Sequence, residues 1–452
     1  MGNDRNMGVR MATQFSVEDN RPWKASFFTI WGGQAISILG SQLVQFALIW
    51  YLTVKTGSAT MLAIASLAGL LPNVLLGPVV GTLVDRWNRR HIMLLADGVI
   101  ALATAILAVL FALDAVELWH IFAVMFVRSL ASSFHGNAMI ASTALMVPVE
   151  HLTRIQGVNE MLNGGLNVIA APLGALLLEV LTIQGILIID ILTALIAILP
   201  LLFTLIPQPA RRDHGEGRNE APMTVWQDFK AGFRYMIGWP GLLIIGLMTV
   251  GVNFMLMPAF SLLPLLVKGH FGGGAMQLGW VESAIGVGVV VGGGLLGVWG
   301  GFKRKILTSM FGVIGIGIST LILAFAPSSA IFLAVGGAFL FGIMNPVTMG
   351  PFFAVIQSAV EPDMQGRIFS IMGSIGTGMA PVGLMIAGPV ADRAGIQLWF
   401  LLGGVMCVCM GVTGMLLPAV MRIEEDHCVM TGLQVNADSG PGLADQGVFD
   451  HA

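Results

Sequence analysis

The sequence has very little charge for its length. Only 10% of its 452 residues are Asp, Glu, Lys or Arg, whereas soluble domains have about 25%. So few charges could not cover the surface of a soluble protein of this size. The net charge of −3 and the lack of a dense basic patch exclude a nucleic-acid-binding protein, which needs clustered Lys and Arg. Because 56% of the residues are hydrophobic, the chain is predicted to be a polytopic membrane protein.

Cysteine and histidine are also scarce. Of the three cysteines, Cys407 and Cys409 lie two residues apart in an apolar run. On a helix their side chains point about 200° apart, so no disulfide is expected between them. No spacing fits a zinc site, and we expect no cofactor. The eight His form no cluster with acids of the kind that catalysis requires, so an enzyme is not expected.

Apolar runs long enough to cross a bilayer recur along the chain. A spanning helix needs about 20 mostly apolar residues. The runs predict an all-α membrane protein with twelve transmembrane helices in two pseudo-symmetric six-helix bundles. The predicted spans are 26–53, 60–84, 91–113, 119–144, 156–180, 184–206, 240–265, 278–300, 305–326, 330–356, 367–390 and 396–420.

The positions of Lys and Arg predict which side each loop faces, because cytoplasmic loops are enriched in these residues. With the N-terminus placed inside, eighteen of the 22 Lys and Arg fall in cytoplasmic segments. Lys55, Lys268 and Arg393 fall outside, and Arg128 lies within a span. We therefore expect a multi-pass protein of the cell membrane with both termini in the cytoplasm.

Polar segments divide the chain into five predicted parts. A linker separates the bundles and includes an amphipathic pattern from Met223 to Trp239, which predicts a helix on the inner membrane surface. The final part is polar and is expected to be a disordered tail. The parts are a cytoplasmic N-terminus (1–25), a first bundle (26–206), a cytoplasmic linker (207–239), a second bundle (240–421) and a cytoplasmic tail (422–452).

The two halves of the sequence resemble one another. Val147-Pro-Val-Glu-His-Leu-Thr-Arg154 aligns with Val360-Glu-Pro-Asp-Met-Gln-Gly-Arg367 at an offset of 213 residues. Six spans, a linker and six similar spans are typical of a two-bundle transporter with a central path. Pro172 and Pro381 are predicted to bend equivalent helices of the two halves.

The loop between the second and third predicted spans carries a recognisable motif. Gly81-Thr-Leu-Val-Asp85-Arg86-Trp-Asn-Arg89-Arg90 resembles the signature loop of the major facilitator superfamily, although Asn88 stands where the family has Gly. The resemblance implies a cytoplasmic latch that holds the outward-facing state. Gly81 would allow close helix approach, and the arginines would bind carboxylates or helix C-termini. The alternative is simple anchoring by positive charge. Asp97 is expected to join the latch around Arg86 and Arg90.

The resemblance extends over nearly all of residues 25–420, and further segments point to one branch of the superfamily. They resemble the drug-exporter branch that includes macrolide-efflux proteins and siderophore exporters. The fifth-span antiporter pattern of that branch is matched in part, by Pro172 and Gly174. The segments are Val127-Arg128-Ser-Leu-Ala-Ser-Ser-Phe134-His135, Met146-Val147-Pro148, Ala171-Pro172-Leu173-Gly174-Ala175, Ile188-Ile189-Asp190 and Trp280-Val-Glu282.

Ionisable residues inside apolar spans are costly, so each is a functional candidate. Arg128 and His135 are seven residues apart and lie on the same face of their helix, and Asp190 lies about six residues from the outer end of its span. We predict proton coupling or substrate contact for these residues and for Glu282, near the outer surface, and Glu160, near the cytoplasm. Structural hydrogen bonding by Arg128, Asp190 and His135, and mere solvation of Glu282 and Glu160, are the alternatives.

Polar stripes predict residues that line a cavity. Gln34, Ser37, Ser41 and Gln45 share one face of the first span, and Glu160, Asn163 and Asn167 share one face of the fifth. A polar face within lipid must turn toward protein or water. Asn253 in the seventh span is a further candidate, and hydrogen bonding between helices is the alternative throughout.

These features together predict a secondary exporter of hydrophobic or amphipathic compounds. With no nucleotide-binding segment in the sequence, the energy would come from an ion gradient, and the exporter would exchange its substrate for protons by alternating access. Alternatives are a dedicated exporter of siderophores or of a native product, and a non-transporting receptor or scaffold. The expected partners are small amphipathic molecules, protons and the lipid bilayer, but not nucleic acid. A monomer is the family expectation.

Overall fold

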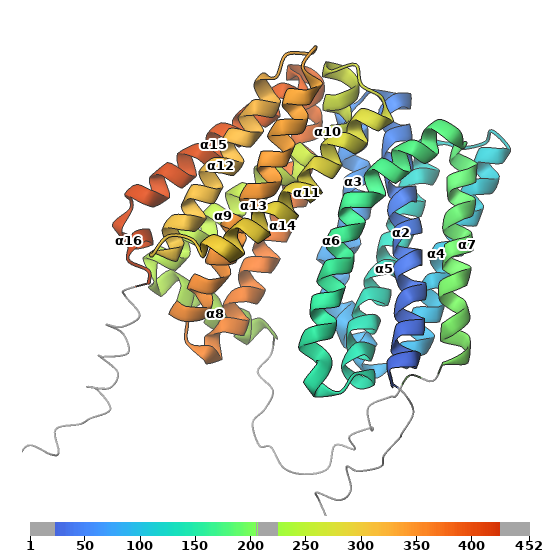
Figure 1. Cartoon of the computed structure of the whole chain (residues 1–452), viewed down its shortest axis with the longest axis horizontal. Helices are drawn as coiled ribbons and strands as arrows, with labels where there is room; N and C mark the ends of the chain where they lie inside the picture. The colour runs from blue at the N-terminus through green and yellow to red at the C-terminus, as the bar shows by residue number, and fades with distance from the viewer. Residues whose placement is uncertain (1–22, 205, 207–224, 425–452) are drawn as a thin grey trace, which may run out of the picture.

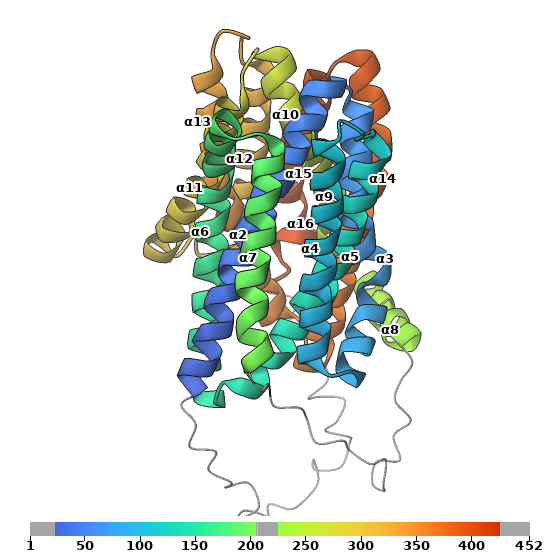
Figure 2. The same ribbon diagram turned by 90° about the vertical axis from the view of Figure 1, so that its right-hand side faces the viewer.

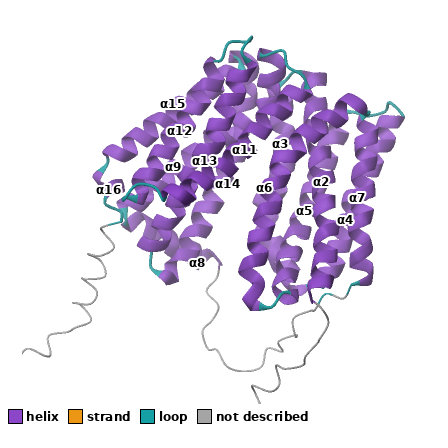
Figure 3. Cartoon of the chain, in the orientation of Figure 1, coloured by secondary structure: helices purple, strands orange, loops and turns teal. Residues whose placement is uncertain are grey.

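The structure, a computed structural model, describes residues 23–204, 206 and 225–424. These residues form helices and turns without any strand (Figure 3). The long helices are α2 (Trp23–Thr56), α3 (Ala59–Arg86), α4 (Arg89–Ala112), α5 (Leu118–Met146), α6 (Val149–Val180), α7 (Ile183–Phe203), α9 (Pro240–Ser261), α11 (Ala275–Trp299), α12 (Lys305–Phe325), α13 (Ile331–Ala359), α14 (Pro362–Ala394) and α15 (Ile396–Leu416). The shorter elements are α8 (Val225–Gly238), α10 (Leu263–Leu265), the π-helical η1 (Leu266–His270) and α16 (Pro418–Met421).

Each of the twelve predicted spans corresponds to one long helix, which confirms the all-α fold class. Among the described residues, eleven helices are long and apolar enough to cross a membrane. The remaining long helix is α5, whose apolar character is lowered by Arg128, His135 and several serines. Residues 1–22, 207–224 and 425–452, which include most of the predicted N-terminal segment, linker and tail, lie outside the described residues.

The helices form two bundles, α2–α7 and α9–α15 (Figure 1). Helices α5, α6 and α7 begin at residues 118, 149 and 183, and α13, α14 and α15 begin 213 residues later, at 331, 362 and 396. This is the offset of the sequence repeat. Within a bundle, helices that are distant in sequence pack together, such as α2 with α7 and α12 with α15.

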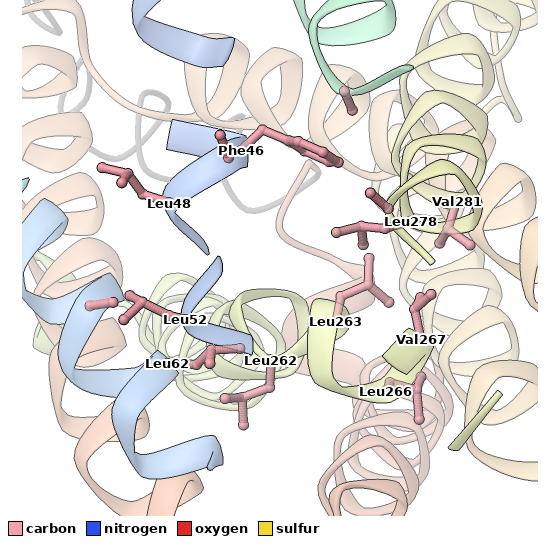
Figure 4. Packing of buried hydrophobic residues seen from close by; sticks show 14 of the residues in the cluster. Phe46, Leu48, Leu52, Leu62, Leu262, Leu263, Leu266, Val267, Leu278 and Val281 are labelled. Carbon is pink, nitrogen blue, oxygen red and sulfur yellow. The ribbon is translucent and has the colours of Figure 1, made fainter. Parts of the chain in front are cut away.

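One end of the molecule joins the two bundles through a shared apolar core. Phe46, Leu52 and Leu62 of α2 and α3 belong to the same buried cluster as Leu263 and Leu278 of α10 and α11. Figure 4 shows these side chains gathered between the two sets of helices. We call this the joined end; it contains the turns at 57–58 and at Gly395.

At the opposite end the bundles have separate cores. Ile30, Val84 and Leu201 belong to a cluster drawn from the first bundle alone, whereas Ile306 and Ile368 belong to one drawn from the second bundle and α8. The ribbons of the two bundles diverge toward this end in Figure 1. We call it the separated end; it contains the turns at 87–88 and 301–304.

Helix α8 lies at the separated end of the second bundle (Figure 2). It packs against α14, and an added Cβ at Gly232 would lie 3.2 Å from Arg367 Cβ. Met236 at its end is buried in the core of the second bundle. Gly232 and Met236 therefore face the second bundle, whereas Phe233 is exposed.

Candidate functional site

A polar cavity of about 410 Å³ lies where the two bundles meet. Its lining comes from α2, α3, α4 and α5 of the first bundle and from α9 and α14 of the second. Ser41 and Gln45 of the predicted stripe line it, as does Arg128. The second bundle contributes Met257, Ser261 and Leu384. A chamber with both polar and apolar walls can hold an amphipathic molecule.

Arg128 and Asp190 form a buried ion pair beside this cavity. Arg128 Nη1 donates to Asp190 Oδ2 and also contacts Thr104 Oγ1. Thr104 Oγ1 donates to the same carboxylate oxygen at 3.0 Å, and Ser41 Oγ donates to Oδ1 at 3.1 Å. Asp190 is 0% exposed, so its charge is balanced by the guanidinium and by two hydroxyl groups. A buried pair with both partners present is tolerated, whereas the loss of one partner leaves an uncompensated charge.

The close approach of α2 to α7 makes this network possible. An added Cβ at Gly40 would lie 3.3 Å from Asp190 Cα and from Asp190 Oδ1. Only a residue without a side chain fits there without displacing the carboxylate. Sequence inspection proposed Asp190 and Arg128 separately, and the structure places them together.

A second cavity, of about 420 Å³, lies within the first bundle between α2, α5 and α6. Gln34, Glu160 and Asn163 of the two polar stripes line it, together with His135. Asn167, from the same stripe, is exposed on α6. The stripe on α2 thus serves two chambers, since Gln34 faces this one while Ser41 and Gln45 face the central one.

Asp97 does not lie where the latch prediction placed it. Its carboxylate accepts a hydrogen bond from Gln34 Nε2 at 3.0 Å and lies 3.5 Å from His135 Nε2. Asp97 is 4% exposed and belongs to the interior of the first bundle. The prediction that it joins Arg86 and Arg90 is therefore corrected, because α4 turns this residue inward, away from the 87–88 turn.

Two other predicted residues also differ in position from expectation. Glu282 does not open its helix near the outer surface. Helix α11 begins at Ala275, which places Glu282 about two turns inside it, roughly 10 Å along the axis. Asn253 donates to Thr249 O of its own helix at 3.0 Å and lines a void of about 50 Å³ within the second bundle. It does not line the central cavity.

Small residues bring α6 and α11 together across the bundles. An added Cβ at Gly279 would lie 3.1 Å from Pro172 Cα, and one at Gly286 would lie 3.1 Å from Val168 Cα. Gly174 lies against the ring of Phe46, 2.9 Å from an added Cβ. Helices α6 and α14 continue through Pro172 and Pro381, and Pro172 lies at the close contact with Gly279.

The predicted latch residues lie at the separated end. An added Cβ at Gly81 would meet no described atom within 4 Å, so the expected close approach is not made in this conformation. Arg86 is exposed and Arg89 is buried. Arg90 donates to Leu201 O at 2.6 Å and to Leu202 O at 2.5 Å, which are carbonyls at the C-terminal end of α7, as expected for a helix-end clamp. Asp85 lies in the last turn of α3.

Asn88, which replaces the usual glycine of the motif, has a local role. Its Oδ1 accepts from Arg90 N at 3.0 Å and His91 N at 3.3 Å. It therefore caps α4, a position where Asn is strongly favoured.

Asp392 makes contacts between the bundles that the sequence did not predict. At the joined end this residue of α14 accepts hydrogen bonds from Ala59 N at 2.6 Å and Thr60 N at 3.0 Å. It also accepts from Ser58 Oγ at 2.9 Å and Thr60 Oγ1 at 2.6 Å, so it caps the first turn of a helix in the other bundle. The sequence held a signal: Gly388-Pro-Val-Ala-Asp392-Arg393 repeats the spacing of Gly81, Asp85 and Arg86.

Two bundles of six long helices, a polar cavity between them and buried charges beside it define a multi-pass secondary transporter of the membrane. The chain belongs to the major facilitator superfamily, whose family model matches residues 30–383 and 258–427. This agrees with the prediction of a transporter rather than an enzyme.

Several known proteins resemble the chain over most of its length. It is 34% identical to macrolide efflux protein A of Streptococcus pyogenes, over 90% of this chain and 100% of that protein. It is 26% identical to the multidrug efflux pump Tap of Mycobacterium tuberculosis, over 85% and 91%. The fold is similar to a solved bacterial homologue of the human lysosomal transporter Spinster, in an inward-facing and unoccupied conformation. That match has a TM-score of 0.62, 12% identity and coverage of 93% and 100%.

Proposed function

We propose that the protein exports hydrophobic or amphipathic compounds, macrolides or a wider set of drugs among them, in exchange for protons. The observation that carries this proposal is the central cavity, which both bundles line and which combines Arg128, Ser41 and Gln45 with apolar residues such as Met257 and Leu384. The names of the two relatives support the direction of transport and the class of substrate.

The separated end faces the cytoplasm in this proposal. Of the 16 Lys and Arg among the described residues, twelve belong to segments at that end, in agreement with the enrichment of such residues in cytoplasmic loops. The structure then corresponds to an inward-facing state, in which a substrate from the cytoplasm or the inner leaflet reaches the cavity while the joined end blocks the way out. Rocking of one bundle against the other would expose the same cavity to the outside.

The latch belongs to the opposite state. Closure of the separated end would bring the 81–90 segment toward the second bundle, where Arg86, which is exposed in this conformation, can contact the start of α14 or its neighbours. Glu282 lies two turns inside α11, between Gly279 and Gly286, which contact α6, and we propose that it contacts substrate in the course of transport. Export of a small molecule by one chain requires no second subunit, so we propose a monomer.

Transport into inside-out membrane vesicles tests the proposal. The vesicles would carry a pH-sensitive dye, be energised, and then receive a macrolide or a cationic amphipathic dye. We expect substrate-dependent proton movement that is absent from vesicles lacking the protein. Response to one compound would indicate a narrow pump, response to many a multidrug pump, and no proton movement with any transported compound would contradict antiport.

A further inference from the structure

We propose that the exchanged proton binds at the pair of Asp97 and His135, on the second cavity of the first bundle, and not at Asp190. The inference rests on the proposed antiport and assigns it a site. It follows from a comparison of the two buried acids of that bundle.

Asp190 is poorly suited to exchange a proton. Both of its carboxylate oxygens accept hydrogen bonds, from Ser41 and Thr104, and Arg128 balances its charge. A proton arriving there would have to displace the guanidinium and leave a buried cation without a partner, which is strongly unfavourable. Asp190 is thus a fixed structural charge that holds α5, α4 and α2 to α7.

Asp97 is equally buried but has fewer partners. Its hydrogen bond comes from the neutral amide of Gln34, and its one titratable neighbour is His135, with Nε2 at 3.5 Å from Oδ1. The Nε2 atom is itself inaccessible to solvent and makes no hydrogen bond with any described residue. This buried nitrogen faces a buried carboxylate just beyond hydrogen-bond distance. A proton shared between the two groups would satisfy both of them.

Among the other described ionisable residues, Glu160 of α6 lines the same cavity as His135, and Arg128 of α5 is paired with Asp190. Helix α7 carries Asp190 alone, already paired, and α3 carries ionisable residues only at its C-terminal end, Asp85 and Arg86. On α4 the nearest are the residues of the 89–91 segment, six or more positions away. On α2 the ionisable groups are Lys24, Tyr51 and Lys55, near the two ends of the helix. The charge at this point therefore depends on Asp97 and His135 together.

The second cavity gives protons a path to the pair. His135 lines that cavity with Gln156, Asn159, Glu160 and Asn163, so water in the cavity can reach the part of the imidazole other than the buried Nε2. Binding adds one proton and changes the pair from a net negative charge to neutral, as a histidinium and carboxylate or as neutral histidine and carboxylic acid. Release to water on the other side of the membrane restores the negative charge, and one proton is moved.

Helix α5 links this site to the substrate cavity. It carries His135 and also Ser132, about one turn earlier, and Arg128, about two turns earlier; these last two line the central cavity. Protonation strengthens the attraction between α5 and α4 at His135, and loss of the proton leaves Asp97 held by Gln34 alone. Any resulting shift of α5 moves the wall of the substrate cavity, which is the coupling that antiport requires.

The experiment compares two transport modes of the purified protein in liposomes. Counterflow of a labelled macrolide at equal pH reports binding and conformational exchange without net proton movement. Accumulation driven by an imposed pH gradient requires proton coupling. We expect Asp97→Asn and His135→Gln to reduce gradient-driven accumulation at least tenfold more than counterflow. Glu179→Gln, an exposed acid at the joined end of α6, should leave both modes unchanged.

Infrared difference spectra between low and high pH, without substrate, provide an independent readout. Asp97→Asn should remove a titrating band that Glu179→Gln retains, and Asp97→Glu should restore a shifted one. Wild-type-like proton coupling and an unchanged spectrum in Asp97→Asn would overturn the assignment while leaving antiport intact. A wild type that accumulates substrate without any proton movement would contradict the antiport itself.

Discussion

The joined and separated ends are built differently from the same twelve helices. At the joined end one apolar core includes residues of both bundles, and Asp392 of α14 caps the start of α3. At the separated end each bundle has a core of its own. Each bundle therefore remains folded there without help from the other, and contact between the bundles can form and break at one end without unfolding either.

The largest expected effect concerns the stability of the first bundle. The bundles can separate at one end without unfolding only if each is stable by itself. Asp190→Asn leaves Arg128 buried without a counter-charge, and we expect the free energy of unfolding to fall by about 3–5 kcal/mol. Denaturation of the purified protein, followed by tryptophan fluorescence, measures this loss. Adding Arg128→Gln should restore part of it, because the two substitutions act on one pair. A loss below about 1 kcal/mol for Asp190→Asn would show that the pair does not hold the bundle together.

The next largest effect is expected from a substitution that weakens the contact between the bundles at the joined end. An added Cβ at Gly388 would lie 2.8 Å from Thr60 Cα, a backbone atom that cannot rotate away. Overpacking of this kind costs about 1–3 kcal/mol, so Gly388→Ala should increase opening at the joined end about tenfold. Hydrogen–deuterium exchange at the amides of Ala59 and Thr60 reports that opening. Gly378→Ala is the control, because it lies in the same helix and its added Cβ would meet no described atom within 4 Å. Equal exchange in both variants would show that close packing at Gly388 does not hold the joined end together.

A smaller effect is expected from the cap across the bundles. Asp392→Ala removes the acceptor of two backbone amides and two hydroxyl groups of the α3 start. Loss of an N-cap costs about 1 kcal/mol, which predicts roughly fivefold faster exchange at the same amides. The neighbouring Arg393→Ala should change exchange little. Protection that survives in Asp392→Ala would mean that the apolar core alone keeps the end joined.

The smallest effect is expected at the separated end, where Arg86 and Arg90 are predicted to have different roles. Arg86 is exposed in this conformation, so Arg86→Gln should leave the thermal stability of the inward-facing form unchanged. It should destabilise the opposite form by about 0.3–1 kcal/mol, which is typical of losing a charge at a helix end. Arg90→Gln, which loses two contacts to the end of α7, should instead reduce stability in either form. Melting curves and transport rates of the two variants distinguish the roles, and a stability loss in Arg86→Gln would contradict the latch proposal.

The fold was predictable from the sequence because its signals are long-range averages. Apolar run length predicted all twelve long helices, and the 213-residue repeat predicted the common offset of α5–α7 and α13–α15. The start of α11 was placed three residues late, since Gln277 separates Ala275 and Met276 from the apolar run that follows, and Glu282 was therefore assigned to the helix opening.

The site was predictable residue by residue but not as pairs. Candidates such as Arg128, Asp190 and His135 follow from the cost of burying charge. Which of them meet depends on the rotation of each helix about its axis, and a shift of one residue turns a helix face by about 100°. That is why Asp97 was assigned to the latch and why the Asp190–Arg128 pair was not foreseen. Asp392 was missed because its partner lies 333 residues away in the sequence; the repeated Gly-Asp-Arg spacing marks the residue but does not reveal its partner.

Distances across the two ends test the central claim, alternating access by the two bundles, most directly. Spin labels at cysteines replacing Ala115 and Ser328 would span the joined end, and labels replacing Glu150 and Gln357 the separated end, in a variant without the native cysteines. All four residues are exposed. When pH and substrate are changed, electron paramagnetic resonance should show the joined-end distance lengthening as the separated-end distance shortens. Two distances that stay fixed, or that lengthen and shorten together, would contradict alternating access.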